Sequence, residues 1–257
     1  SSKTLTKSKS PYLVKDGLTI NSGVTLTINP GVVIKFYDTA SQITASGAIK
    51  ANGTSQDKII FTSFKDDSYG GDLNNDGSLT SAQYGDWKII SLDGSGSEFD
   101  QTIIRYGGKN SSNGWANLKV KNTSATIKNS TIEESNAYGL WLDSATGTID
   151  GNTIRNNTHD SAAVGIYATA GGAEIKNNTI QSNTIGMQIE SGNTSTITNN
   201  TFTSNTGAAI YSISSYPTFS GNTASSNGYN GVLITGSQNA NYSFSNNLVY
   251  IIDATYT

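Results

Sequence analysis

The residues best suited to chemistry are the oxygen-bearing side chains of one short acidic segment. Asp72, Asn74 and Asp76 occupy alternate positions of the run DLNNDGS, which matches the first half of an EF-hand calcium loop. Oxygens at the first, third and fifth positions of such a loop converge on a hard cation, because the following Gly77 permits a tight turn. This segment therefore predicts a bound calcium ion.

The second half of the calcium pattern is altered. Gln83 stands at the twelfth position, where a bidentate acid is expected, while Asp86 follows three residues later and Asp67 precedes the loop. These two carboxylates are candidate replacements. The expected ligands of a structural calcium ion are Asp67, Asp72, Asn74, Asp76, Ser78 and Asp86. The alternative is an Asp- and Asn-rich turn that binds no cation.

Acid–base catalysis has few candidates in this chain. His159 is the single histidine, and Asp160 beside it is its only local acidic partner. Glu133 and Glu134 are sequence neighbours, which we expect to point in different directions, whereas glycoside hydrolysis needs carboxylates about 5 to 9.5 Å apart. We therefore expect no catalytic residues and no enzymatic activity.

These residues lie in a chain with a regular repeat. An Asn-rich phrase begins at Ile127, Ile149, Ile175, Ile197, Phe219 and Phe244, with successive spacings of 22, 26, 22, 22 and 25 residues. A fixed period of this length is typical of a solenoid. Apolar residues alternate with polar ones in GLWL and GMQI, and Thr, Ile, Val and Tyr are frequent, which favours strands. The 26-residue copy places extra residues, including His159, on a bulging loop.

Coils of about 22 residues with three short strands predict an all-β parallel β-helix, in which equivalent residues stack at about 4.8 Å. The asparagines then form columns at the coil corners, where side-chain amides bond to the copies above and below. One column contains Ser130, Asn152, Asn178, Asn200, Asn222 and Asn247; the other contains Asn157, Asn183, Asn205 and Asn227. Most of the asparagines are therefore interpreted as architecture.

A different column is expected to face outward and bind a ligand. Counting from the apolar anchors, it contains Trp141, Tyr167, Gln188, Tyr211 and Leu233, while Leu140 and Leu142 face the core. Aromatic rings one coil apart can stack on the sugar rings of an extended polysaccharide. The alternative is that these rings only shield the backbone of the sheet.

Several segments together resemble a known family. The combination SGVTLTINPGVVIKF, IIFTSFKDDSYGGDLNNDGS, GDWKII and FDQTIIRYGG, followed by the Asn-rich repeats, resembles the right-handed parallel β-helix repeat proteins of bacterial and archaeal surfaces. The match covers essentially the whole chain. It implies a right-handed, pectate-lyase-like solenoid, commonly one module of a larger secreted or wall-attached protein, and it does not imply a single activity.

The enzymes that this resemblance brings to mind have motifs that are missing here. Pectate lyases use an acidic calcium cluster and an Arg base, but Arg105 and Arg155 lie in no R-x-P-x-x-R pattern. The G-H-G motif of polygalacturonase-like hydrolases is also missing. A calcium-dependent lyase or hydrolase remains an alternative.

The composition of the chain argues against nucleic-acid binding and against a membrane-spanning helix. A net charge of −3 gives no basic footprint for nucleic acid, and no apolar run approaches the roughly 18 residues that a membrane helix needs. We expect one domain over residues 1–257, with a long loop at about 63–87. The terminal segment LVYIIDATYT leaves an apolar edge, so the chain is expected to continue beyond Thr257 into further domains.

Together these observations predict a non-catalytic, extracellular or cell-surface module for adhesion or polysaccharide binding, with a polysaccharide or a host or cell-surface molecule as its ligand. A purely structural stalk or surface-layer module is the remaining alternative.

Overall fold

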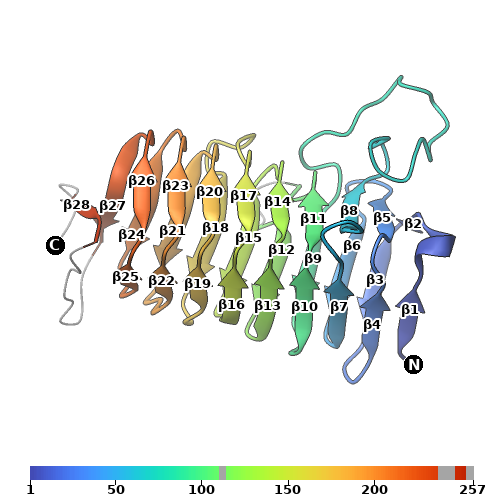
Figure 1. The fold of residues 1–257 in the computed structure, drawn as a ribbon, viewed down its shortest axis with the longest axis horizontal. Coiled ribbons are helices and arrows are strands. Elements are labelled where there is room, and N and C mark those ends of the chain that lie inside the picture. The colour runs from blue at the N-terminus through green and yellow to red at the C-terminus, as the bar shows by residue number, and fades with distance from the viewer. Residues whose placement is uncertain (110–113, 237–246, 253–257) are drawn as a thin grey trace.

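The chain forms an elongated right-handed solenoid of parallel strands (Figure 1). The computed structural model describes residues 1–109, 114–236 and 247–252. Within these ranges the helical segment is the short 3-10 helix η1 (Lys7–Lys9), and no helix is long and apolar enough to cross a bilayer. The predicted all-β parallel β-helix is confirmed.

Three parallel sheets run the length of the stack. Sheet A contains β1 (Lys3–Leu5), β4 (Thr25–Ile28), β7 (Ala48–Asn52), β10 (Ser97–Asp100), β13 (Ser124–Lys128), β16 (Thr146–Asp150), β19 (Glu174–Lys176), β22 (Thr196–Thr198) and β25 (Thr218–Ser220). Sheet B contains β2 (Tyr12–Val14), β5 (Val33–Phe36), β8 (Ile59–Ser63), β11 (Thr102–Arg105), β14 (Thr131–Glu133), β17 (Thr153–Arg155), β20 (Thr179–Gln181), β23 (Thr201–Thr203) and β26 (Thr223–Ser225). Sheet C contains β3 (Gly17–Ile20), β6 (Gln42–Ala45), β9 (Ile89–Leu92), β12 (Ala116–Lys121), β15 (Tyr138–Asp143), β18 (Val164–Thr169), β21 (Ile185–Glu190), β24 (Ala208–Ile213), β27 (Tyr229–Thr235) and β28 (Val249–Ile252).

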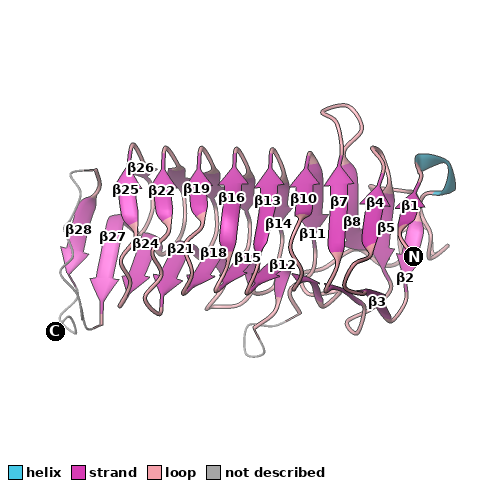
Figure 2. Cartoon of the chain, turned by 90° about the horizontal axis from the view of Figure 1, so that it is seen from below, coloured by secondary structure: helices cyan, strands magenta, loops and turns pink. Residues whose placement is uncertain are grey.

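Each coil passes through sheets A, B and C in that order, and equivalent residues of successive coils pair in register. Figure 2 shows the strands of sheet A side by side along the stack. The predicted repeat is reproduced here, because Ile127, Ile149, Ile175, Ile197 and Phe219 are successive Cα partners in this sheet. Phe244, the expected start of the sixth copy, and Thr257 lie outside the described residues.

The core is a set of apolar columns that lie inside the solenoid. Inward residues such as Ile127, Ile149 and Ile175 are fully buried, and each contributes about 1.5–3 kcal/mol relative to exposure. In the first coils larger rings fill the interior, where the buried Phe36 and Trp87 stack with centroids 4.1 Å apart.

Both predicted asparagine columns are hydrogen-bonded ladders. At the corner between sheets A and B, Asn178 donates from Nδ2 to Asn200 Oδ1 and to the Ile149 carbonyl, each at 2.9 Å. Its Oδ1 accepts from the backbone N–H and Nδ2 of Asn152. The column of Asn157, Asn183, Asn205 and Asn227 repeats this arrangement between sheets B and C. At a corner the backbone N–H and C=O groups cannot pair within a sheet. Each asparagine amide gives these buried groups a hydrogen-bond partner.

The residue before each ladder asparagine explains the frequent Asn-Asn pairs. Asn156, Asn177 and Asn199 have φ values of 56°, 55° and 55°, and glycines occupy the same place before Asn152 and Asn222. This left-handed conformation turns the chain sharply, and Asn tolerates it better than most residues. The first Asn of each pair therefore makes the corner, and the second one stacks.

Of the long connections between sheets B and C, those that join β8 to β9 and β17 to β18 are described in full and leave the regular path. The longer one joins β8 to β9 and projects from the stack as the teal loop in Figure 1. The shorter one, between β17 and β18, contains the exposed His159 as expected. The two insertions meet, since the Tyr84 ring stacks on the His159 ring at a centroid distance of 5.4 Å.

Removing a central rung of the first ladder is expected to destabilise the solenoid. Asn178→Ala removes the hydrogen-bond partner of the buried N–H groups of Asn152 and of the Ile149 carbonyl. The free energy of unfolding should therefore fall by about 3 kcal/mol. Urea unfolding measures this loss. Asn177→Gly is the matched control, because it keeps the left-handed corner and leaves the ladder intact. Equal losses in the two variants would contradict the ladder's role.

Candidate functional site

The long loop between β8 and β9 is attached to the outside of sheet B through a buried lysine. Lys35 points outward from β5, yet the loop covers it completely. Its Nζ donates to the carbonyl oxygens of Asp66 and Gly71 at 2.9 and 2.6 Å. Burial lowers the pKa of Lys35, while the charges of Asp66, Asp67 and Asp72 oppose that shift. The buried ammonium group of Lys35 therefore anchors the start of the loop to sheet B.

The expected calcium ligands gather beyond this anchor. One carboxylate oxygen each from Asp67, Asp72 and Asp76 lies within 4.8 Å of the others. Asp67 Oδ1, Asn74 Oδ1 and Asp76 Oδ1 are buried and have no hydrogen-bond partner among the described residues. Asp72 instead accepts from the backbone N–H groups of Asp76 and Gly77, at 3.2 and 2.8 Å.

This donor set fits a hard cation. A buried oxygen without a partner costs about 1–3 kcal/mol, and a calcium ion coordinated by carboxylate and amide oxygens removes that penalty. Asp67, Asp72, Asn74 and Asp76 would hold such an ion, which would close the loop without entering a reaction. The calcium site itself stays a prediction.

Two of the expected ligands have other surroundings. Asp86 accepts from Ser63 Oγ at 2.7 Å and from Lys65 Nζ at 2.9 Å, so its carboxylate ties the end of the loop to its beginning. It does not join the group formed by Asp67, Asp72 and Asp76. Ser78 is exposed, two residues beyond Asp76.

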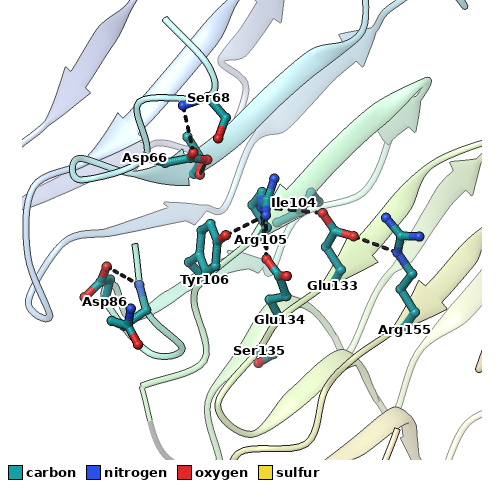
Figure 3. Close-up of polar contacts among 12 residues, drawn as sticks. Asp66, Ser68, Asp86, Ile104, Arg105, Tyr106, Glu133, Glu134, Ser135 and Arg155 are labelled. Atoms are coloured by element: carbon teal, nitrogen blue, oxygen red, sulfur yellow. Dashed lines mark hydrogen bonds and ion pairs between the residues drawn. The ribbon is translucent and has the colours of Figure 1, made fainter. Parts of the chain in front are cut away.

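A ladder of alternating charges continues along sheet B next to this loop (Figure 3). Arg105, Glu133 and Arg155 are Cα partners on β11, β14 and β17. Glu133 is buried and contacts both arginines, with its oxygens 3.4 Å from Arg105 Nε and 2.8 Å from Arg155 Nε. Glu134 also accepts from Arg105 Nη2, at 2.6 Å. The expectation that Glu133 and Glu134 diverge is therefore wrong, because the turn after β14 brings both carboxylates to Arg105.

Under the combined effect of burial and the charges of the ladder, the pKa values of Arg105 and Tyr106 are both shifted upward. Burial by itself lowers the pKa of Arg105, but its bond to Glu134 and the charges of Glu133 and Glu134 outweigh burial and raise it. Burial raises the pKa of Tyr106, whose hydroxyl accepts from Arg105, so this phenol keeps its proton at neutral pH. Sequence reasoning missed the ladder because its rungs are 28 and 22 residues apart.

The outward column predicted on sheet C is present and in register. Trp141, Tyr167, Gln188, Tyr211 and Leu233 are successive Cα partners and half-buried, while Leu140 and Leu142 face the core. Trp141 and Tyr167 have ring centroids 5.7 Å apart. Tyr138, which the sequence did not single out, joins them with its centroid 4.5 Å from that of Tyr167. Sheet C thus presents an outer aromatic surface.

A groove lies at the N-terminal end of this column. It has a volume of about 250 Å³, and its lining includes Ser91, Trp115, Lys119, Lys121 and Trp141. Lys119 Nζ lies 3.3 Å from the centre of the Trp141 ring and 2.9 Å from an Asp143 oxygen. The indole Nε1 of Trp141 is buried without a partner among the described residues. A ligand would meet here a ring face, a cation and several hydroxyl or carboxylate groups.

The coil geometry, corner ladders and in-register outer columns define a right-handed parallel β-helix protein. The chain belongs to the family described as "Right handed beta helix region", which matches residues 88–251. Residues 1–114 match a second family, "Pectate-lyase like beta helix domain".

Two individual proteins show more limited likeness. A 63-residue segment is 38% identical to Protein bark beetle of Drosophila melanogaster; this segment is 24% of the chain and spans about 2% of that protein. The crystal structure of an alginate lyase from Paenibacillus sp. str. FPU-7 aligns with 95% of this chain and 99% of its own, with a TM-score of 0.43 and 11% identity.

These comparisons correct one expectation from the sequence. The chain was expected to lack enzymatic activity, because its single histidine and two arginines lie in no familiar catalytic motif. The match of residues 1–114 to a pectate-lyase-like family overturns that expectation. Motif spacing was a poor guide, since a β-helix assembles outer columns from residues on different coils.

Calcium is expected to bind the acidic loop and stabilise the fold. At about 100 times its dissociation constant, the ion should raise the free energy of unfolding by about 2.7 kcal/mol, measured by thermal and urea unfolding. Asp76→Ala should abolish the calcium heat in isothermal titration, because it removes an orphaned ligand oxygen. Asp86→Asn is the control and should retain that heat. A wild-type protein without calcium heat contradicts the site; loss of binding in Asp86→Asn restores Asp86 as a ligand.

Proposed function

We propose that the outer face of sheet C binds an extended polysaccharide, and that the protein acts in an extracellular or cell-surface setting. The main support is the column of Trp141, Tyr167, Gln188 and Tyr211, which are Cα partners on successive coils. Rungs of a parallel sheet are about 4.8 Å apart, an interval comparable to the rise of an extended sugar chain. A polysaccharide running along the solenoid axis would meet an equivalent position at each coil.

The chemistry of the column supports a carbohydrate ligand. Aromatic rings offer apolar faces to the C–H groups of a sugar, and the surrounding polar side chains bond its hydroxyls. The rings are held in place before binding, since Tyr138, Trp141 and Tyr167 pack on each other. Little side-chain entropy would then be lost on binding.

The groove beside Trp141 favours a polysaccharide that carries carboxylates. Lys119 and Lys121 project from the same face of β12 into this groove, and Lys88 lies over the Trp115 ring at 4.5 Å. Lys119 is paired with Asp143, whereas Lys121 is exposed. An anionic sugar would gain charge-assisted hydrogen bonds at this end of the column.

Eliminative cleavage of the bound polysaccharide is the second candidate function, and the family match of residues 1–114 favours it. A lyase must neutralise the uronate carboxylate, so that the adjacent C–H becomes acidic, and must protonate the leaving oxygen as its bond to carbon breaks and the double bond forms. The proton taken from that C–H passes to a base, and Glu190, whose charge acts on Tyr138, is the carboxylate available for it on this face. Lys119 and Lys121 carry the charge for the first task. Burial, with the charges of Glu190 and Asp160, raises the pKa of Tyr138, so its phenol retains a proton for the second.

Replacing the rings of the column should abolish polysaccharide retention. For the triple variant W141A/Y167A/Y211A, affinity electrophoresis in gels containing polygalacturonate or alginate should show binding weaker by about tenfold or more. The change removes three stacking surfaces from one face. Tyr37→Ala serves as the control, because Tyr37 is an exposed ring far from this column, against Phe64. Retention equal to that of wild type would refute the binding face.

The lyase candidate has a separate assay. The protein should release unsaturated products from polygalacturonate or alginate, detected by their ultraviolet absorbance, and Lys119→Met should lower the rate about tenfold by removing a neutralising charge. Lys176→Met on sheet A is the control. No product from either polymer would exclude eliminative cleavage of these substrates and leave the binding proposal standing.

A further inference from the structure

One rung of the sheet C column differs chemically from its neighbours. Gln188 on β21 is the Cα partner of Tyr167 on one side and Tyr211 on the other. An aromatic side chain here would have continued the stacking surface. The glutamine is half-buried, and none of the hydrogen bonds among the described residues involves its side-chain amide. Its donors and its acceptor are therefore free for a ligand.

A carboxylate lies beside this amide on the same face. Glu190 follows Gln188 by two residues on β21, so both side chains project outward from sheet C. The hydroxyl of Tyr167 donates to Glu190 Oε1, which holds the carboxylate next to the column. Burial raises the pKa of Glu190, as expected for a carboxylate with few compensating partners. Its second oxygen can accept a further hydrogen bond.

We propose that Gln188 and Glu190 form a hydroxyl-reading subsite between the sugar residues that stack on Tyr167 and Tyr211. This inference rests on the proposed polysaccharide function and adds the determinant of its specificity. The amide donates and accepts, and the carboxylate accepts, so together they suit two neighbouring free hydroxyls of one sugar residue. Ring stacking discriminates poorly between sugars of similar shape, whereas polar groups left unpaired by a blocked hydroxyl penalise the wrong ligand.

The position of the pair strengthens this assignment. It lies in the middle of the column, two coils from the cationic groove beside Trp141, so charge recognition and hydroxyl recognition fall on different sugar residues. The selected ligand is a polysaccharide whose hydroxyls are unsubstituted at the Gln188 rung. Chains that carry O-acetyl groups at that position would lose both hydrogen bonds and clash with the half-buried amide.

The test compares native polygalacturonate and alginate with the same polymers after chemical O-acetylation, using affinity electrophoresis. Wild type should bind at least one native polymer about tenfold more tightly than its acetylated form. Gln188→Leu keeps the size of the side chain and removes its hydrogen bonds, so it should weaken native binding and lower the ratio, with the remaining discrimination left to Glu190. Gln188→Tyr should bind both forms, because it restores a continuous aromatic column.

The outcomes separate the two proposals. An unchanged ratio in Gln188→Leu, in a protein whose binding still depends on Trp141, Tyr167 and Tyr211, overturns the subsite and keeps the binding face. Failure of wild type to bind either native polymer overturns both. Thermal melting of each variant shows whether it is folded, and Gln181→Leu on sheet B is the matched control, since it makes the same substitution on a different outer face.

Discussion

Hydrogen bonds between successive corner asparagines fix the register on which every outer column depends. Each amide bonds to the asparagines above and below and to a backbone carbonyl, so a coil displaced along its path by one residue would lose a whole set of buried bonds. Strand pairing alone tolerates slippage where polar residues dominate both faces. The ladders thus allow a chain with a modest apolar content to hold Trp141, Tyr167 and Tyr211 in one line.

The long loop follows a different principle, since charge rather than periodicity holds it. Lys35 anchors its start from beneath, the Asp86–Lys65 pair ties its end, and the Tyr84 ring rests on His159 of a later insertion. The buried oxygens of Asp67, Asn74 and Asp76 remain without a hydrogen-bond partner among the described residues. The loop and the aromatic face therefore lie on different sheets, so the expected cation site and the proposed sugar-binding face are physically separate.

The sequence was a good guide wherever the repeat was strict. Equivalent residues such as Asn178 and Asn200, or Trp141 and Tyr167, could be placed in columns because one anchor fixed all positions of a coil. It was a poor guide where spacing varied. Arg105 and Glu133 are separated by an irregular coil, and Lys35 is buried only because a distant loop folds over it. Asp86 bonds to Lys65 instead of joining the group formed by Asp67, Asp72 and Asp76. Such contacts depend on three-dimensional loop paths that no period encodes.

The left-handed corner residues have a consequence for how such a protein can change. Because the corner of each coil is set by one local conformation, at Asn177 or Asn199 for example, every coil closes independently of its neighbours' length. Loops between sheets B and C can therefore be long, as the connections before β9 and β18 are, while the strands of sheet C stay paired in register. Gain or loss of a whole coil would therefore lengthen or shorten the outer face of sheet C by one residue position and leave the other positions of the column in place.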